Sequence, residues 1–181
     1  MKSSISIIIL STLILGGCAT APITLNYAPS STKTVNGALT VGNFEYLPSK
    51  IGKFPVDPNQ IKNTAIGDII LDKNIDEFFK TALFTESRFV GIKMNSNNAV
   101  VSGQIKEFLI DDLGYSIDWT LEVNYVVKNN GHENNCYDKT HIIKKNTAKF
   151  ANEFGTLNEI MKLNIEKAFN DKSFVTCISV I

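Results

Sequence analysis

Residues 117–127 read IDWTLEVNYVV and contain the most regular alternation of apolar and polar side chains in the protein. Ile117 and every second residue as far as Val127 are apolar, whereas five of the six intervening residues from Asp118 to Lys128 are polar. A strand with this period of two has one dry and one wet face, which is typical of an antiparallel sheet covered on one side. The stretch therefore predicts a sheet with one face open to solvent.

Further strands are predicted around this segment. Residues 99–109 alternate in the same way, and residues 137–150 follow a connector, 129–135, whose Asn-Gly step favours a reversal of the chain. Residues 39–46 are expected to form a first strand, and residues 174–181 a short last strand.

Two amphipathic helices are predicted from capping boxes followed by apolar stripes. Asn74 with Glu77 opens the first helix, and Thr156 with Glu159 opens the second. The stripes, which have helical spacing, are Ile75, Phe78, Phe79, Ala82 and Leu83 in the first helix and Leu157, Ile160, Met161, Ile165, Ala168 and Phe169 in the second, where Asn164 is the one polar intrusion.

These elements predict an α+β fold in two layers. Two apolar helix stripes and one apolar sheet face bury one another when they stack. We therefore expect a two-layer sandwich with a largely antiparallel sheet, ordered strand, helix, three-strand meander and helix, in which two amphipathic helices pack on the sheet.

The N-terminus has the pattern of a secretory signal. A short charged start precedes the mostly apolar run 5–15, which is too short to span a bilayer. The sequence Leu15-Gly16-Gly17-Cys18 then resembles the lipobox of bacterial lipoproteins. This resemblance implies that residues 1–17 are removed as a signal peptide, that Cys18 is acylated, and that Ala19 permits sorting to the outer membrane.

The region after the lipobox is expected to be a tether followed by one domain. All five prolines lie in the first third of the chain, and residues 18–37 are predicted to be the acylated cysteine and a flexible linker. Residues 38–181 are expected to form a single α/β domain in the periplasm, because their length suits one compact unit.

The charge balance argues against a nucleic-acid partner. The 181 residues include 18 Lys and Arg against 18 Asp and Glu, so the formal net charge is zero. Sequence-independent binding of nucleic acid needs a surplus of basic side chains to neutralise phosphates.

Cys136 and Cys177 are the cysteines that remain once Cys18 carries a lipid. In an oxidising compartment two such thiols favour a disulfide, although two separate buried thiols are the alternative. The bond would close a loop of about forty residues and contribute on the order of 4 kcal/mol by the chain-entropy relation.

The residues suited to catalysis or metal binding form no recognisable pattern. His132 and His141 are the only histidines, and no serine or cysteine has a local activating context. A metal site from both histidines with Glu133 and Cys136 is conceivable from the spacing, but these residues do not share a strand face. We therefore expect no enzyme, no metal and no cofactor.

Several segments resemble the YajG-like lipoproteins, which are small outer-membrane proteins of Gram-negative bacteria. The resemblance is carried by residues 78–83, the VVSGQI stretch at 100–105, the Trp119 to Tyr125 strand and the Leu157-Asn158 helix start. The order of elements is also similar to LptE and to the TolB N-terminal domain. This resemblance implies an accessory or assembly role in an envelope complex without chemistry of its own.

The sequence thus leaves two functions open. The first is a non-catalytic outer-membrane lipoprotein, held in the membrane through Cys18, that binds an envelope protein through a sheet edge or the polar sheet face. The alternative is a carrier of lipid or glycolipid, which predicts an unfilled apolar groove between helices and sheet.

Overall fold

A computed structural model describes residues 21–65, 67, 69–94, 99–129, 135–149 and 152–179. Cys18 and the signal sequence before it lie outside the described residues, so cleavage and acylation remain predictions. In the part of the chain that is described, no helix is both long and apolar enough to cross a membrane.

The described elements are seven strands, three α-helices and one 3-10 turn. The strands form one sheet, and their bounds are β1 Ala38–Tyr46, β2 Gln60–Asn63, β3 Ile69–Ile70, β4 Lys93–Met94, β5 Ala99–Asp111, β6 Ser116–Asn129 and β7 Tyr137–Ala148. The helices are α1 Ile75–Phe89, α2 Glu153–Asn170 and α3 Lys172–Ile178, and the 3-10 turn η1 is Leu47–Ser49.

The sheet is mixed, so the expectation of a largely antiparallel sheet with a strand, helix, meander and helix arrangement is wrong. β1 pairs in parallel with β5 and β4, and β2 also pairs in parallel with β5. The pairs β5–β6, β6–β7 and β2–β3 are antiparallel. Helix α1 lies between β1 and β5 in the chain and packs on β1. It returns the chain to the end of the sheet where β1 begins, so that β5 runs parallel to β1. The alternation shows which face is covered but does not show the direction of the neighbouring strand.

The predicted last strand is also wrong, because residues 172–178 form helix α3. The Asp171 side chain accepts a hydrogen bond from the Ser173 amide at 2.9 Å and caps the helix. Phe174, Cys177 and Ile178 are buried at helical spacing, which explains why this short apolar segment is helical. In the described part of the chain, the helical layer therefore contains three helices rather than two.

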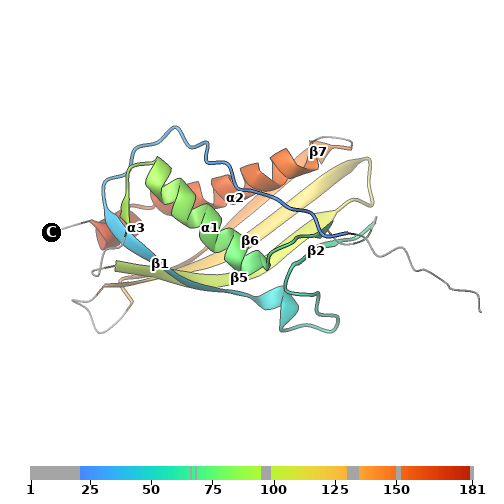
Figure 1. Ribbon diagram of the computed structural model, residues 1–181, viewed down its shortest axis with the longest axis horizontal. Helices are drawn as coiled ribbons and strands as arrows, with labels where there is room; N and C mark the ends of the chain where they lie inside the picture. The colour runs from blue at the N-terminus through green and yellow to red at the C-terminus, as the bar shows by residue number, and fades with distance from the viewer. Residues whose placement is uncertain are drawn as a thin grey trace, which may run out of the picture.

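Helices α1 and α2 lie over one face of the sheet (Figure 1), and the buried apolar side chains form a core between the helices and this face. The rings of Phe44, Phe79 and Tyr125 pack together in this core, with centroids 5.1 to 6.1 Å apart. A Cβ atom on Gly103 would lie 1.9 Å from the Asn124 carbonyl oxygen and 3.0 Å from the Phe44 ring. Glycine is therefore required where β5 and β6 approach each other beside this ring.

Residues 23–35, which fall inside the segment expected to be a linker, form an N-terminal strap over the helical layer (Figure 1). The Glu86 carboxylate on α1, which is fully buried, accepts hydrogen bonds from the Tyr27 hydroxyl at 2.5 Å and the Ser31 amide at 2.7 Å. Burial and this bond raise the pKa of Tyr27 above its usual value. The Val35 amide donates to the Val90 carbonyl at 2.9 Å. The strap is thus part of the folded unit.

Candidate docking surface

The face of the sheet that points away from α1 and α2 is built from alternate residues of the long strands. The strand register aligns Gln104 of β5, Asn124 of β6 and Thr140 of β7 in one row across this face. The next row contains Ser102, Val126 and Asp138. We call these residues and their neighbours on β1 the open face, and the sequence alternation predicts its polar character on β5 and β6.

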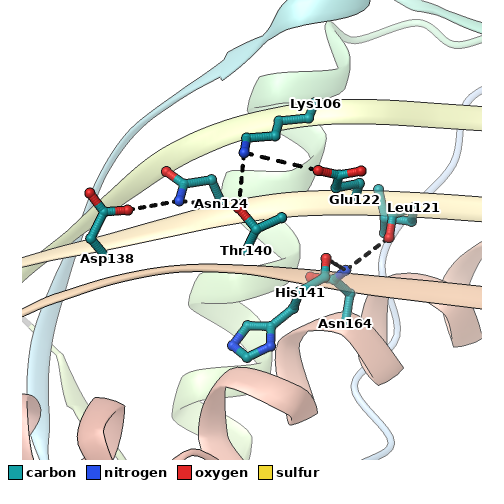
Figure 2. A network of polar contacts seen from close by, with 8 residues as sticks. All are labelled: Lys106, Leu121, Glu122, Asn124, Asp138, Thr140, His141 and Asn164. Carbon is teal, nitrogen blue, oxygen red and sulfur yellow. Dashed lines mark hydrogen bonds and ion pairs between the residues drawn. The ribbon is translucent and has the colours of Figure 1, made fainter.

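Side chains on the open face bond across three strands, as Figure 2 shows. Lys106 Nζ donates to Thr140 Oγ1 at 3.0 Å and lies 3.9 Å from Glu122 Oε1. Asn124 Nδ2 donates to Asp138 Oδ1 at 2.9 Å and lies 3.4 Å from Thr140 Oγ1. Lys106 sits at an irregularity where β5 shifts register against β6. These bonds hold polar groups in fixed positions on a solvent-facing surface.

The opposite side of the same strands is held by Asn164 of α2, which also appears in Figure 2. Its Nδ2 donates to the carbonyls of Leu121 at 3.1 Å and His141 at 3.0 Å, and its Oδ1 accepts from the Tyr125 hydroxyl at 2.8 Å. Asn164 is fully buried. The polar intrusion seen in the sequence is therefore a satisfied group that fixes α2 against β6 and β7.

A shallow hollow of about 530 Å³ lies on the open face over β1, β5 and β6. Its lining is mostly polar and consists of Asn43, Phe44, Glu45, Ser102, Gly103, Gln104, Asn124, Val126, Lys128 and Asn135. Amide and hydroxyl groups of this kind can donate to and accept from a protein backbone or polar side chains. The hollow is suited to a polar partner rather than to a hydrocarbon chain.

Glu45 places a carboxylate, paired with Lys50, in the lining of this hollow. Its Oε1 accepts from Lys50 Nζ at 3.0 Å and its Oε2 accepts from Gln104 Nε2 at 3.0 Å. These two hydrogen bonds and the charge of Lys50 lower the pKa of Glu45 below its usual value. No local sequence signal marks Glu45, because its neighbour Gln104 lies on β5, which is distant in the sequence.

His141 lies in a second polar cluster at the start of β7. The Tyr137 hydroxyl is 2.7 Å from His141 Nε2 and donates to Asp171 Oδ2 at 3.1 Å, and Lys139 Nζ donates to the same oxygen at 2.8 Å. The hydrogen bond from Lys139 lowers the pKa of Asp171 to about 2, while burial lowers the pKa of His141. Asp171 also caps α3, so the cluster links β7 to the helices. Asp171 could not be identified from the sequence, where its one local signal is that it is a polar residue between two apolar helical segments.

Cys136 and Cys177 are joined in a disulfide, as predicted from the two cysteines that remain besides Cys18. The bond connects the residue before β7 to α3, and its Cα atoms lie 5.8 Å apart. Phe174 of α3 packs edge-on against Tyr137, with ring centroids 5.3 Å apart. The disulfide therefore keeps α3 over this end of the core.

Within the described residues, no group of three or more His, Cys, Asp or Glu side chains is placed to hold a metal ion. His132 and Glu133 lie outside those residues, and Cys136 is in the disulfide. Of the acidic residues near the β5–β6 turn, Asp112 lies 3.1 Å from Lys149 Nζ, and Asp118 accepts from Asn146 at 2.8 Å.

Comparisons with known proteins show a shared fold. No protein-family model and no curated protein matches the chain. Among solved structures, protein XCC0632 from Xanthomonas campestris, described with the family model DUF330, aligns over 87% of this chain and 95% of its own, with 10% identity and a TM-score of 0.58. The hypothetical protein CT253 from Chlamydia trachomatis aligns over 75% and 92%, with 11% identity and a TM-score of 0.48. A minor lipoprotein from Acinetobacter baumannii aligns over 78% and 92%, with 8% identity and a TM-score of 0.38. Of these three, the XCC0632 alignment shows that the fold is shared.

Proposed function

We propose that this chain is a lipoprotein of the bacterial outer membrane, anchored through an acylated Cys18, whose periplasmic domain is a non-catalytic accessory or assembly partner of an envelope complex. The lipid anchor would confine the domain to a thin layer and raise its effective concentration toward a partner in that layer. The partner would dock on the open face of the sheet.

The observation that carries this proposal is the ordered polar network on the open face. Hydrogen bonds among Lys106, Thr140, Asn124 and Asp138 fix these side chains before any partner arrives. Side chains that are already ordered lose less conformational entropy on binding, which favours a specific complex. The lipobox-like sequence at Cys18 supports the anchor.

The alternative function as a lipid or glycolipid carrier is less well supported. It needs an unfilled apolar groove between the helices and the sheet. The large side chains described at that interface, including Phe78, Phe79, Phe108 and Tyr125, are buried and packed against one another. The hollow on the open face is lined mostly by polar residues.

Site-specific photo-crosslinking tests the docking surface. Val126 lies in the hollow, and its side chain makes no polar bond that a benzoylphenylalanine would break. We expect this probe at Val126 to give one discrete protein adduct in cells, and expect Ser102→Arg in the same hollow to abolish it. The controls are the same probe at Phe84 and the change Thr81→Arg, both on the outer side of α1. An equal adduct from Phe84, or an adduct that survives Ser102→Arg, would contradict the proposal.

Mass spectrometry of the membrane-extracted protein tests the anchor separately. The expected N-terminus is Cys18 with added acyl mass, and Cys18→Ser should release the domain from the membrane. An uncleaved chain that begins at Met1 and carries no acyl group would refute the assignment as a lipoprotein.

A further inference from the structure

The N-terminal strap fixes where the chain leaves the folded domain. Ile23 forms a parallel bridge with Leu71 beside β3; its amide donates to the Ile70 carbonyl at 2.8 Å, and its carbonyl accepts from the Asp72 amide at 3.0 Å. The five residue steps from Cys18 to Ile23 span at most about 18 Å when fully extended. If Cys18 is acylated, this end of the domain is therefore held close to the lipid head groups.

The tip of the β5–β6 hairpin, residues 113–115, lies at the same end of the domain. β3 pairs with β2, and β2 pairs with the last part of β5 at Leu109 and Ile110. Figure 1 shows the start of the strap and the hairpin tip at one end of the long axis, with α3 at the other. A bilayer that holds Cys18 would thus face this tip.

The tip exposes two large side chains that carry apolar surface. Leu113 is 73% exposed and Tyr115 is 103% exposed, although both side chains would bury readily in a protein core. Leucine favours the acyl boundary of a bilayer, and tyrosine favours the head-group layer, where its ring is buried and its hydroxyl stays hydrated.

The base of the tip is ordered by polar contacts. Asp111 Oδ1 accepts from Thr64 Oγ1 at 2.7 Å and from the Leu113 amide at 3.3 Å. The Asp112 carboxylate, which is 3% exposed, lies 3.1 Å from Lys149 Nζ. The turn is therefore tied to the residues that directly follow β2 and β7, and its apolar residues project from an ordered base.

We infer that residues 113–115 form a second membrane contact, in which Leu113 and Tyr115 insert into the bilayer surface and orient the anchored domain. This inference rests on the proposed acylation of Cys18. Two side chains alone bind a bilayer weakly, but the lipid tether supplies the high local concentration that lets a weak contact form. In this orientation the long strands extend away from the bilayer. The open face is then roughly perpendicular to the membrane plane and is accessible to a neighbouring protein in the same membrane.

Tryptophan fluorescence in vesicles tests the contact. Trp119 is the only native tryptophan and is buried, so wild-type protein supplies the background signal. Leu113→Trp places a probe at the tip, and Phe89→Trp places a matched probe at the exposed C-terminal end of α1, at the other end of the domain. Acylated protein is reconstituted into vesicles of phosphatidylethanolamine and phosphatidylglycerol that contain brominated phosphatidylcholine, a short-range quencher.

We expect bromine to quench the L113W signal several-fold more than the F89W signal, with blue-shifted L113W emission. Cys18→Ser should remove most of this quenching. Equal and weak quenching at both positions, in protein whose acyl mass is confirmed, would overturn the membrane contact but leave the proposed function standing. Absence of the acyl mass would refute the proposed function itself. Retained background fluorescence and an intact disulfide check that each variant is folded.

Discussion

Asn164→Leu is expected to destabilise the domain by about 3–5 kcal/mol. Leucine is close to asparagine in shape, so the change removes hydrogen bonds without opening a large cavity. The Tyr125 hydroxyl, which is fully buried, would lose its acceptor at a cost of about 1–3 kcal/mol. The carbonyls of Leu121 and His141 would each lose a donor at about 1 kcal/mol.

Urea denaturation followed by circular dichroism measures this loss as a lower midpoint with an unchanged slope. The matched control is Asn158→Leu on the same helix, where the two hydrogen bonds to Ala28 are exposed to solvent. We expect the control to lower the free energy of unfolding by about 1 kcal/mol. If the two variants agree within about 0.5 kcal/mol, the reasoning that burial makes Asn164 costly is refuted.

A double-mutant cycle with Tyr125→Phe isolates the buried pair. Each single change leaves one partner without its hydrogen bond, whereas the double change leaves neither. We expect the double variant to be less destabilised than the sum of the singles by about 1 kcal/mol or more. Additive effects would mean that Asn164 and Tyr125 do not depend on each other.

Three further outcomes follow from the other buried polar and covalent contacts. Glu86→Gln leaves one acceptor oxygen for two donors, so we expect the free energy of unfolding to fall by about 2 kcal/mol and the N-terminal strap to be cleaved faster by protease. Tyr27→Phe should have a smaller effect on both. A strap that resists protease in Glu86→Gln as well as in the wild type would contradict this role of Glu86. Replacing both Cys136 and Cys177 by serine is expected to lower the free energy of unfolding by about 4 kcal/mol, because the loop that they close has a sequence separation of 41. An unchanged midpoint of urea denaturation would contradict this stabilising role of the disulfide. Burial lowers the pKa of His141, so the stability that this residue contributes is complete above its unfolded pKa of about 6.5 and is lost as the pH falls below that value. The free energy of unfolding should therefore fall less between about pH 7.5 and about pH 5 in His141→Phe than in the wild type. An equal fall in both proteins would disprove this role of His141.

The sequence predicts the faces of individual elements better than it predicts their arrangement. The alternation from Ile117 to Val127 correctly separates buried residues from half-exposed or exposed ones on β6, because each side chain's face depends only on local geometry. The direction of β1 relative to β5 depends on how α1 carries the chain across the sheet, and no local pattern reports it. The mixed sheet could therefore not be predicted in this way.

The polar contacts show the same limit. Asn164 interrupts an apolar stripe and is visible in the sequence, and Glu86 also falls on the stripe of α1, three residues after Leu83. Their partners, Tyr125 and Tyr27, are distant in sequence and come together only in the folded chain. A polar residue on an apolar stripe thus signals a buried partner without identifying it.

The position of β5 has a consequence for the order of folding. β5 pairs with β6 along nearly its whole length through a short turn, whereas β1 and β2 pair with it only after the chain has returned through α1. Closing the longer loops costs more chain entropy than closing the hairpin. We therefore expect β5 and β6 to form the folding nucleus and β1 to add late, so that destabilising changes in β1 speed unfolding while those in the hairpin slow folding.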